Sequence, residues 1–424
     1  MTYSSIKKLA VALLGMSVSC LTFGKSLTLP KGVGMYQYSY RNLDSLNQQF
    51  DKDGYVETIG DGFSRDLKGP DFLENGSSED LKRLAVELKK FDFAGDRSGI
   101  LRSLSLGTFE VDVDVDASAQ IYAVAYGFTD HMTGFFGVPV VDVKVETDMQ
   151  LNGQNTSAEL RRRLGDLSYE ELAEGLEQAG ALNVDRIKDS LYELEYEDLD
   201  QWEHQGLGDI QLGTVVAKKF GVAGAVINQP YGKWTLMLPT AYKDDPNNLI
   251  DTDLGNGYLA NQFLVGHNIS LFSTFYLGAE LGYTVGSSYG KEVRRPDENG
   301  SSLVPRENLE TIEINPGAGT SITGYFGASY GILAGEYRLV KGSREKDTLT
   351  SGDSEVYKDL LEGSAKEILY EIYSVGLTTT KLYEKGRFPI PLMLTAYKKS
   401  NIEGSNQSLD DYVEIEIASF FKIP

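Results

Sequence analysis

Acidic side chains alternate with valines at residues 110–116, where the sequence runs EVDVDVD. Oxygen ligands at every second position would suit an EF-hand calcium loop, which also needs glycine at its sixth position and glutamate at its twelfth. If Asp112 is the first ligand, Ala117 and Ala123 stand in those two places. The stretch therefore lacks the turn and the bidentate ligand of a calcium loop, and we expect no metal site and no cofactor.

A second interpretation places the same stretch in one long, two-faced β-strand. From Phe109 to Ala125 every second residue is Phe, Val, Ile or Ala, while the intervening positions begin with four acids. Successive side chains of a strand point to opposite faces. Long alternating strands are typical of transmembrane β-barrels, with apolar residues toward lipid and polar residues toward the lumen. On this pattern Val111 and Val113 are expected to face lipid.

Catalytic groups are sparse in the sequence. His131 and His267 fall in predicted turns and His204 ends a predicted helix, and none has a nucleophile at a recognisable spacing. The run HNIS at 267–270 is faintly similar to the His and Ser of outer-membrane phospholipase, but that enzyme carries them on a lipid-facing strand. The chain is therefore not expected to be an enzyme.

The N-terminus has the pattern of a secretory signal peptide. Lys7 and Lys8 precede an apolar run at 9–23, so residues 1–24 are expected to be removed. A single membrane anchor and lipoprotein processing at Cys20 are the alternatives. Because Cys20 is the only cysteine, the mature chain would contain no disulfide and no cysteine site.

Composition favours a β-rich membrane protein. The 424 residues carry a net charge of −22, which argues against nucleic acid as a partner because phosphates need basic surfaces. The 45 glycines and 25 tyrosines suit turns and aromatic belts. A soluble chain of this length would usually divide into several domains, whereas a large barrel closes into one unit. We expect an all-β fold with residues 25–424 as a single domain.

Strand-like segments and connections follow each other in a regular order. Twelve strands are expected, at 33–42, 107–128, 134–149, 207–219, 221–240, 255–267, 270–286, 308–321, 324–340, 366–383, 387–399 and 410–421. Short turns are expected at 129–134, 219–223, 266–270, 321–324 and 383–388, and longer connections at 43–106, 150–206, 241–254, 287–307, 341–365 and 400–409. An even strand number with short periplasmic turns and long outer loops is the pattern of a bacterial outer-membrane barrel.

Two of the long connections, 43–106 and 150–206, contain predicted helices. The first helix starts near Ser78 and spaces leucines along one face. In the second connection Ser168 and Glu171 form a capping box for a helix, and a third helix is expected over 183–202. These helices either decorate the outer surface or form a lid or plug over the lumen.

Charged residues on the predicted strands are expected to point into the lumen. On the lipid side each charge would cost up to about 2–4 kcal/mol near the bilayer midplane. They either solvate the interior or select the cargo, and an acidic lumen would favour cations and neutral solutes. The predicted lumen-lining residues are Asp112, Asp114, Asp142, Lys144, Glu146, Glu313, Glu414 and Glu416.

The last predicted strand ends with an aromatic residue, Phe421, three residues before the C-terminus. Such a strand is the usual signal for the barrel-assembly machinery, which is therefore an expected partner. The other expected partners are outer-membrane lipids and a small-molecule cargo.

Several motifs resemble one family of outer-membrane barrels. They are YGFTDHMTGFFGVPVV at 126–141, GLGDIQLG at 206–213, LMLPT at 236–240 and GNGYLANQFLVG at 255–266. Together they resemble the family associated with meta-pathway phenol degradation, which is distantly similar to long-chain fatty-acid and aromatic hydrocarbon channels. The resemblance covers about 107–285. Ala241, where the family usually has glycine, and the long 150–206 insertion depart from it.

Three functions follow as hypotheses. The resemblance implies a channel for passive uptake of small molecules, hydrophobic or aromatic ones included. A closed structural or surface-binding barrel is the alternative, and an outer-membrane hydrolase is a further one. The channel is the hypothesis carried forward.

Overall fold

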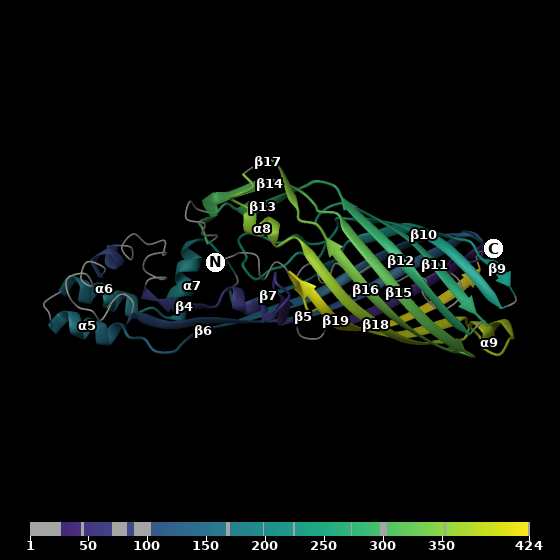
Figure 1. The fold of residues 1–424 in the computed structure, drawn as a ribbon, viewed down its shortest axis with the longest axis horizontal. Coiled ribbons are helices and arrows are strands. Elements are labelled where there is room, and N and C mark those ends of the chain that lie inside the picture. The colour runs from purple at the N-terminus through teal and green to yellow at the C-terminus, as the bar shows by residue number, and fades with distance from the viewer. Residues whose placement is uncertain are drawn as a thin grey trace.

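The alternating segments of the sequence become the wall of one closed, antiparallel barrel (Figure 1). This computed structural model describes residues 27–43, 46–69, 83–88, 103–166, 170–197, 199–223, 225–272, 274–296, 303–351 and 353–422. The predicted signal peptide and the capping residue Ser168 lie outside the described residues. The twelve wall strands are β1 (Val33–Leu43), β5 (Ser105–Thr129), β6 (Met132–Asn152), β8 (Ile210–Ala217), β10 (Val226–Leu238), β11 (Ala260–Leu271), β12 (Phe275–Gly286), β15 (Gly319–Tyr330), β16 (Leu333–Arg344), β18 (Lys366–Thr378), β19 (Leu392–Ser405) and β21 (Tyr412–Lys422).

Each wall strand pairs with the next one along the chain, and the last strand pairs back to the first. The closing ladder between β1 and β21 runs from Val33 opposite Lys422 to Leu43 opposite Tyr412. A closed sheet has no free edge, so every wall strand has hydrogen-bonding partners on both sides. The predicted fold class and strand number are confirmed.

Two predicted turns are wrong. The segments 266–270 and 321–324 lie inside β11 and β15, and the chain reverses after Leu271 and after Tyr330 instead. Asn268 and Thr323 of these segments point inward, and small or polar lumen residues resemble turn residues in a sequence. The other short connections lie at or near the predicted places, at the right-hand end of Figure 1.

The predicted strand 308–321 is divided into two parts. The first part is β14 (Leu309–Asn315), which pairs with β13 (Tyr289–Arg294) and β17 (Thr348–Ser351) in a separate sheet among the outer loops. Pro316 follows β14 and has no N–H to continue a ladder. The wall resumes at Gly319 with β15.

The hairpin of β5 and β6 extends well beyond the rest of the wall (Figure 1). β5 has 25 residues and β6 has 21, whereas about 9–11 residues suffice to cross a bilayer. At about 3.3 Å per residue, the excess length of β5 amounts to roughly 45 Å. Two shorter strands extend the ladders of the hairpin: β4 (Arg65–Lys68) pairs with β5, and β7 (Gln201–Leu207) pairs with β6. A separate small sheet consists of β2 (Gln48–Phe50), β3 (Val56–Thr58) and β20 (Gln407–Ser408). The hairpin therefore forms a stalk on the outer side.

Helices at the tip of the stalk form a knob, defined here by helical residues 83–88, α5 (Ser157–Asp166) and α6 (Glu170–Gly180). Leu84, Leu88, Leu160 and Leu176 pack together at its centre. Figure 1 places the knob far from the barrel mouth, so these helices do not cover the lumen. No helix among the described residues is both long enough and apolar enough to span a bilayer.

The third predicted helix is shorter than expected and lies nearer the barrel. It is α7 (Val184–Glu193), and it ends well before residue 202, where β7 has already begun. Leu191 and Leu194 pack against the core at the barrel mouth. The remaining described helices are the single turns η1 (Ile59–Gly62) and η3 (Arg306–Asn308), the short α8 (Lys358–Glu362), and α9 (Thr380–Glu384) at the opposite end. That end carries the short turns, which in outer-membrane barrels lie on the periplasmic side.

The alternation of β5 is present, but its faces are reversed with respect to the prediction. Val111, Val113 and Val115 are buried, while Asp112 and Asp114 are exposed on the outside. The expectation that these valines face lipid is wrong. This part of β5 belongs to the stalk, where loop residues fill the inner side and water bathes the outer one.

The covering residues come from loops that are distant in sequence. Leu46, Ile59, Tyr196, Leu199 and Ile250 pack with the three valines in one buried cluster. Farther along β5, the outward-facing positions carry exposed apolar residues instead of acids. Tyr122 and Val124 are among them, and such residues suit the lipid band. The strand therefore keeps one parity while the surroundings of each face change along its length.

The reversed faces lead to a first test. Val113→Lys would bury an unpaired charge and is expected to destabilise the folded barrel by several kcal/mol. Asp112→Lys places the same side chain on the exposed face and is expected to change stability by only about 0.5 kcal/mol or less. The shift in gel mobility between folded and heat-unfolded protein, followed with temperature, measures both. Equal effects of the two variants would show that the faces are assigned wrongly.

Candidate functional site

One side of the lumen wall is apolar. Inward positions of β5 and β6 carry Ala119, Ile121, Ala123 and Phe135, and β8 adds Val215; all five are buried. Ile121, Ala123, Phe135 and Val215 belong to one hydrophobic cluster near the periplasmic end. In this cluster they pack with Leu29 and Met35, so the interior on this side of the barrel is apolar.

The opposite side of the wall is rich in tyrosines and charges. On β10 and β12 the Tyr231 hydroxyl donates a hydrogen bond to Glu280, and its oxygen lies 3.4 Å from that of Tyr325 on β15. On β16 Arg338 forms an ion pair with Glu336, and its guanidinium carbon lies 5.1 Å from the centre of the Tyr325 ring. In the order of the sheet β15 and β16 lie five and six strands from β6, across the barrel from it, whereas β10 adjoins β8, so the polar side begins next to the apolar one.

A third group of charges lies near the seam between β1 and β21. Arg41 donates two hydrogen bonds to Glu414 Oε2, of 3.0 Å and 2.7 Å, from its cross-strand position. Its guanidinium also lies 4.1 Å from the Tyr412 ring centre. Lys399 pairs with Asp410 at 2.5 Å. Buried charges of this kind are tolerated because each has an opposite charge as its partner.

The inward tyrosines lie flat on glycines of the neighbouring strands. A Cβ atom at Gly266 would come within 2.4 Å of the Tyr231 ring, and one at Gly278 within 2.4 Å of the Tyr325 ring. No side chain larger than hydrogen fits beneath these rings. The glycines therefore hold the tyrosines against the wall and keep them out of the middle of the lumen.

The predicted lumen residues separate into two groups. Glu414 and Glu416 of β21 do point inward; Glu414 is paired with Arg41, and Glu416 accepts a 3.3 Å hydrogen bond from Tyr397. The placement of the others in the lumen is wrong. Glu313 is exposed on β14 in the loop sheet, and the remaining five lie on the outer face of the stalk, namely Asp112, Asp114, Asp142, Lys144 and Glu146.

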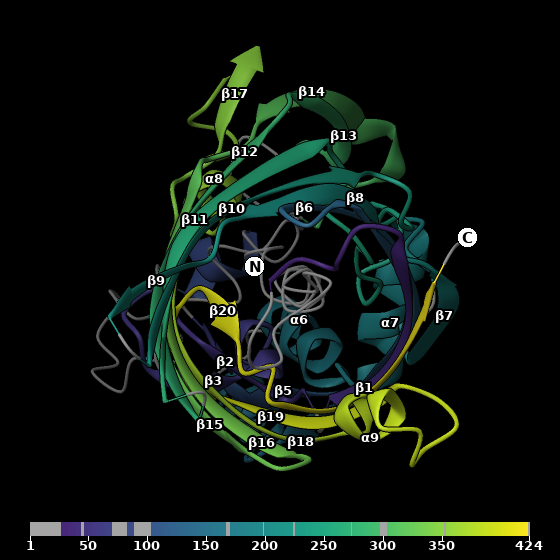
Figure 2. The same cartoon turned by 90° about the vertical axis from the view of Figure 1, so that its right-hand side faces the viewer.

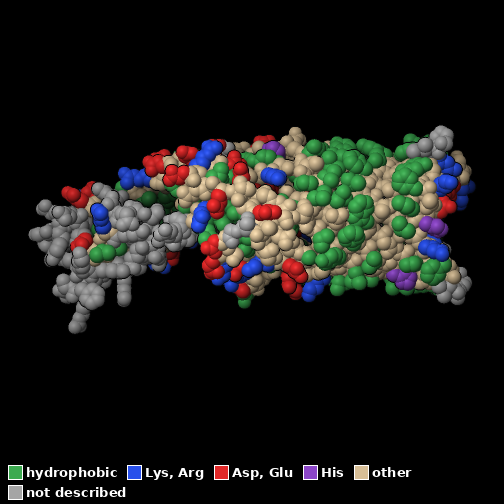
Figure 3. All heavy atoms as spheres, turned by 90° about the horizontal axis from the view of Figure 1, so that it is seen from above, with side chains coloured by type: hydrophobic (Ala, Val, Ile, Leu, Met, Phe, Trp, Pro, Cys, Tyr) green, Lys and Arg blue, Asp and Glu red, His purple; other side chains and the backbone are tan. Residues whose placement is uncertain are grey.

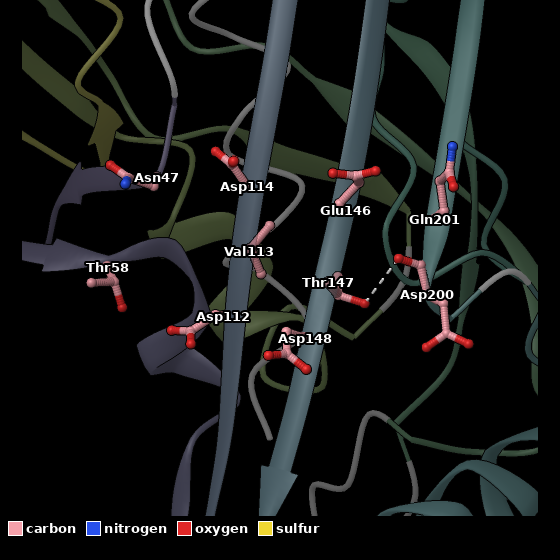
Figure 4. A pocket seen from close by; sticks show the side chains of 10 residues that line it. All are labelled: Asn47, Thr58, Asp112, Val113, Asp114, Glu146, Thr147, Asp148, Asp200 and Gln201. Atoms are coloured by element: carbon pink, nitrogen blue, oxygen red, sulfur yellow. Dashed lines mark hydrogen bonds between the residues drawn. The ribbon is translucent and has the colours of Figure 1, made fainter.

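On that outer face, acids of β5 and β6 line a surface groove of about 670 Å³ (Figure 4). Asp112 lies opposite Asp148, and Asp114 lies opposite Glu146, while Asp200 flanks them. Lys144 forms a 2.5 Å ion pair with Glu146. Within the part of the chain that the structure describes, no group of acids and histidines has the arrangement of a metal site.

Buried polar contacts join the loops at the outer mouth, which the sequence did not indicate. Arg294 donates to the carbonyl oxygens of Leu194, Glu195 and Val304 and to Asn247 Oδ1, at 2.6–2.8 Å. Its guanidinium also stacks on Tyr196, 3.7 Å from the ring centre. One side chain thus connects three different outer connections.

Lys291 makes a similar connection between β13 and the loop that follows β10. Its amine lies 2.9 Å from Asp244 and 3.2 Å from Asp253. Burial alone would lower the pKa of Lys291, but the attraction of the two carboxylates outweighs burial and raises the pKa well above its ordinary value. Lys291 is therefore charged, and it fixes the two loops to each other.

Two of the predicted histidine positions are corrected. His267 lies on the outward face of β11, not in a turn, and its cross-strand neighbours are Pro230 and Ala279, which carry no catalytic group. His204 lies in β7, where its ring packs 4.3 Å from that of Tyr242. Neither arrangement provides a nucleophile next to the histidine.

Comparison with known proteins supports the fold. No family model and no curated protein matches the sequence. The structure is similar to an outer membrane channel from Pseudomonas putida F1, with a TM-score of 0.50 and 9% identity over 93% of this chain and 97% of that chain. The CymD monoaromatic hydrocarbon channel matches with a TM-score of 0.30 and 7% identity, over 93% of this chain and 89% of that one.

A FadL homologue from Pseudomonas aeruginosa also matches, with a TM-score of 0.30 and 7% identity over 97% of both chains. At such identities the similarity concerns the fold alone. The chain has the fold of a bacterial outer-membrane β-barrel.

The tyrosine and glycine contacts provide a second test. Gly278→Ala would force the Tyr325 ring away from the wall, and we expect a loss of about 1–3 kcal/mol in stability, as in other overpacked sites. Gly324→Ala is the matched control, because a Cβ there meets no atom within 4 Å. Unfolding in urea, in the same detergent, compares the two variants. Equal midpoints would mean that the tyrosine packing does not depend on the glycine.

Proposed function

We propose that the barrel is a channel for passive uptake of small molecules that combine an aromatic or apolar part with a polar group. The observation that carries this proposal is the pair of unlike lumen walls. Binding passages for such molecules are mostly apolar, with a few placed polar groups that orient the solute. A ring would enter between the packed side chains on the apolar side of β5, β6 and β8, while hydroxyls such as that of Tyr325 would meet its polar substituent.

The pairing of the lumen charges argues against a simple cation filter. Glu414, Glu336 and Asp410 each have a cationic partner. The acids expected to attract cations in the lumen lie mostly on the outside. Selection in this proposal therefore depends on shape and polarity more than on net charge.

The outer mouth would act as a narrow entrance. Leu199, Ile250 and Leu254 of the outer loops pack on the inner face of the stalk, and Arg294 and Lys291 connect the loops. The same packing also favours the second candidate function, a closed barrel whose outer surface binds a partner. Transport measurements separate the two.

Other features agree with the channel. The similar protein from Pseudomonas putida F1 is described as an outer membrane channel. The motifs at 126–141 and 206–213 resemble those of the phenol meta-pathway family. Delivery to the outer membrane would use the barrel-assembly machinery through β21, the strand that closes the wall.

Swelling of liposomes that contain the purified mature protein tests the proposal. Serine and phenylalanine are suitable solutes, because both are zwitterions that cross bilayers slowly and they differ in the aromatic ring. We expect phenylalanine to enter at least as fast as serine despite its larger size. A plain water-filled pore would admit serine faster, and swelling with neither solute would support the closed barrel.

Ile121→Asn replaces a buried apolar side chain of the lumen wall by a polar one and serves as the matched variant. The rate for phenylalanine relative to serine should fall about fivefold, the effect of about 1 kcal/mol of lost apolar contact. Ile121→Val keeps the wall apolar and should retain the ratio. An unchanged ratio in the asparagine variant would exclude this wall as the path.

A further inference from the structure

The periplasmic end of this acidic chain is basic. The described turns and termini at that end carry exposed cations that outnumber the acids Asp130 and Glu384. None of these cations has an ion pair among the described residues. They are Lys31, Lys218, Lys219, Lys381, Lys385, Arg387 and Lys422. Figure 3 shows Lys and Arg side chains at the right-hand end of the barrel, next to a broad hydrophobic band.

Exposed aromatic side chains lie in the same turns. Phe220 follows β8, Phe272 follows β11, and Tyr330 ends β15; Phe272 and Tyr330 are 73% and 84% exposed. Phe272 also has a φ of 52°, a left-handed conformation that costs a bulky residue about 1–2 kcal/mol. Packing within the chain does not explain a strained, exposed phenylalanine, whereas insertion into the edge of a bilayer would bury its ring.

The connection between β18 and β19 combines both features. Between Thr379 and Pro391 it exposes Lys381, Lys385 and Arg387 together with Tyr383, Phe388 and Ile390. Figure 2 shows its helix, α9, outside the barrel wall, away from the lumen. Thr379 Oγ1 accepts a 2.8 Å bond from Leu392 N and donates a 2.9 Å bond to the Ile390 carbonyl oxygen. These bonds fasten the ends of the connection to each other and leave its charged middle free.

We propose that this basic and aromatic rim, centred on residues 379–391, binds the anionic headgroups of phospholipids in the periplasmic leaflet. Cations near an anionic leaflet gain about 1 kcal/mol each, and aromatic side chains favour the membrane interface. The rim lies at the barrel end next to the apolar band, so its neighbours are lipids. An acidic protein would match the charge but would leave the ring of exposed aromatic side chains without a counterpart. The proposal stands independently of what passes through the lumen.

Lipid enrichment in nanodiscs tests the proposal. The purified mature protein is placed in discs of phosphatidylethanolamine and cardiolipin, and native mass spectrometry after disc release counts the lipids that stay bound. The wild type should retain cardiolipin above its proportion in the disc. Lys381→Gln, Lys385→Gln and Arg387→Gln together should lower this enrichment at least about fivefold, the change expected from one headgroup contact of about 1 kcal/mol.

A matched control removes the same charge from the outer end, with Lys52→Gln, Lys346→Gln and Lys358→Gln, and should leave enrichment unchanged. If the rim variant does not fold, the salt dependence of cardiolipin enrichment by the wild type tests the proposal instead. Enrichment should fall as salt rises from 0.1 M to 1 M, because the screening length shrinks from about 10 Å to about 3 Å. Absence of enrichment in the wild type would overturn the proposal. An equal loss in the outer control, or preference for a polyglutamate probe over cardiolipin, would overturn it as well.

Discussion

Closure of the sheet between β1 and β21 is the constraint on which the rest of the molecule depends. In lipid, an unpaired backbone N–H or C=O group costs several kcal/mol, so a membrane-spanning sheet must have no edge. The closing ladder provides the last set of backbone partners over the full length of β1. Once the ring is closed, each wall residue points either inward or outward, and every later choice of side chain follows from this alternation.

Closure also explains why the lumen is crowded with specific pairs. Inward side chains from twelve strands share a limited space, so large residues need small neighbours and charges need partners. Tyr231 over Gly266 is one solution, and Arg41 with Glu414 is another. These contacts leave an apolar side around Ile121 and a polar side around Glu280, and that division supports a passage for solutes of mixed polarity.

The structural features of the molecule differ along the barrel axis. The knob and stalk extend outward, the loops connected by Arg294 form the mouth, and the two-sided lumen follows below. The basic rim around Arg387 lies at the other end, in the zone that suits lipid headgroups. The net charge of −22 is therefore distributed unevenly, with the acids of the stalk facing water and the exposed side chains of the opposite rim mostly basic.

The sequence by itself determined the barrel, its strand number and the parity of each strand, because alternation has a period of two wherever a strand has unlike faces. Parity did not determine direction: Val113 faces inward because loop residues such as Ile250 cover it, while Ile415 on β21 faces outward in the predicted way. The small and polar residues at 266–270 and 321–324 resembled turns, because the sequence alone does not show which residues lie opposite a side chain. The partners of Arg294, the rings over the glycines and the outer position of the acidic face of β5 all depend on residues far apart in the chain. Only the tertiary structure decides which of them meet.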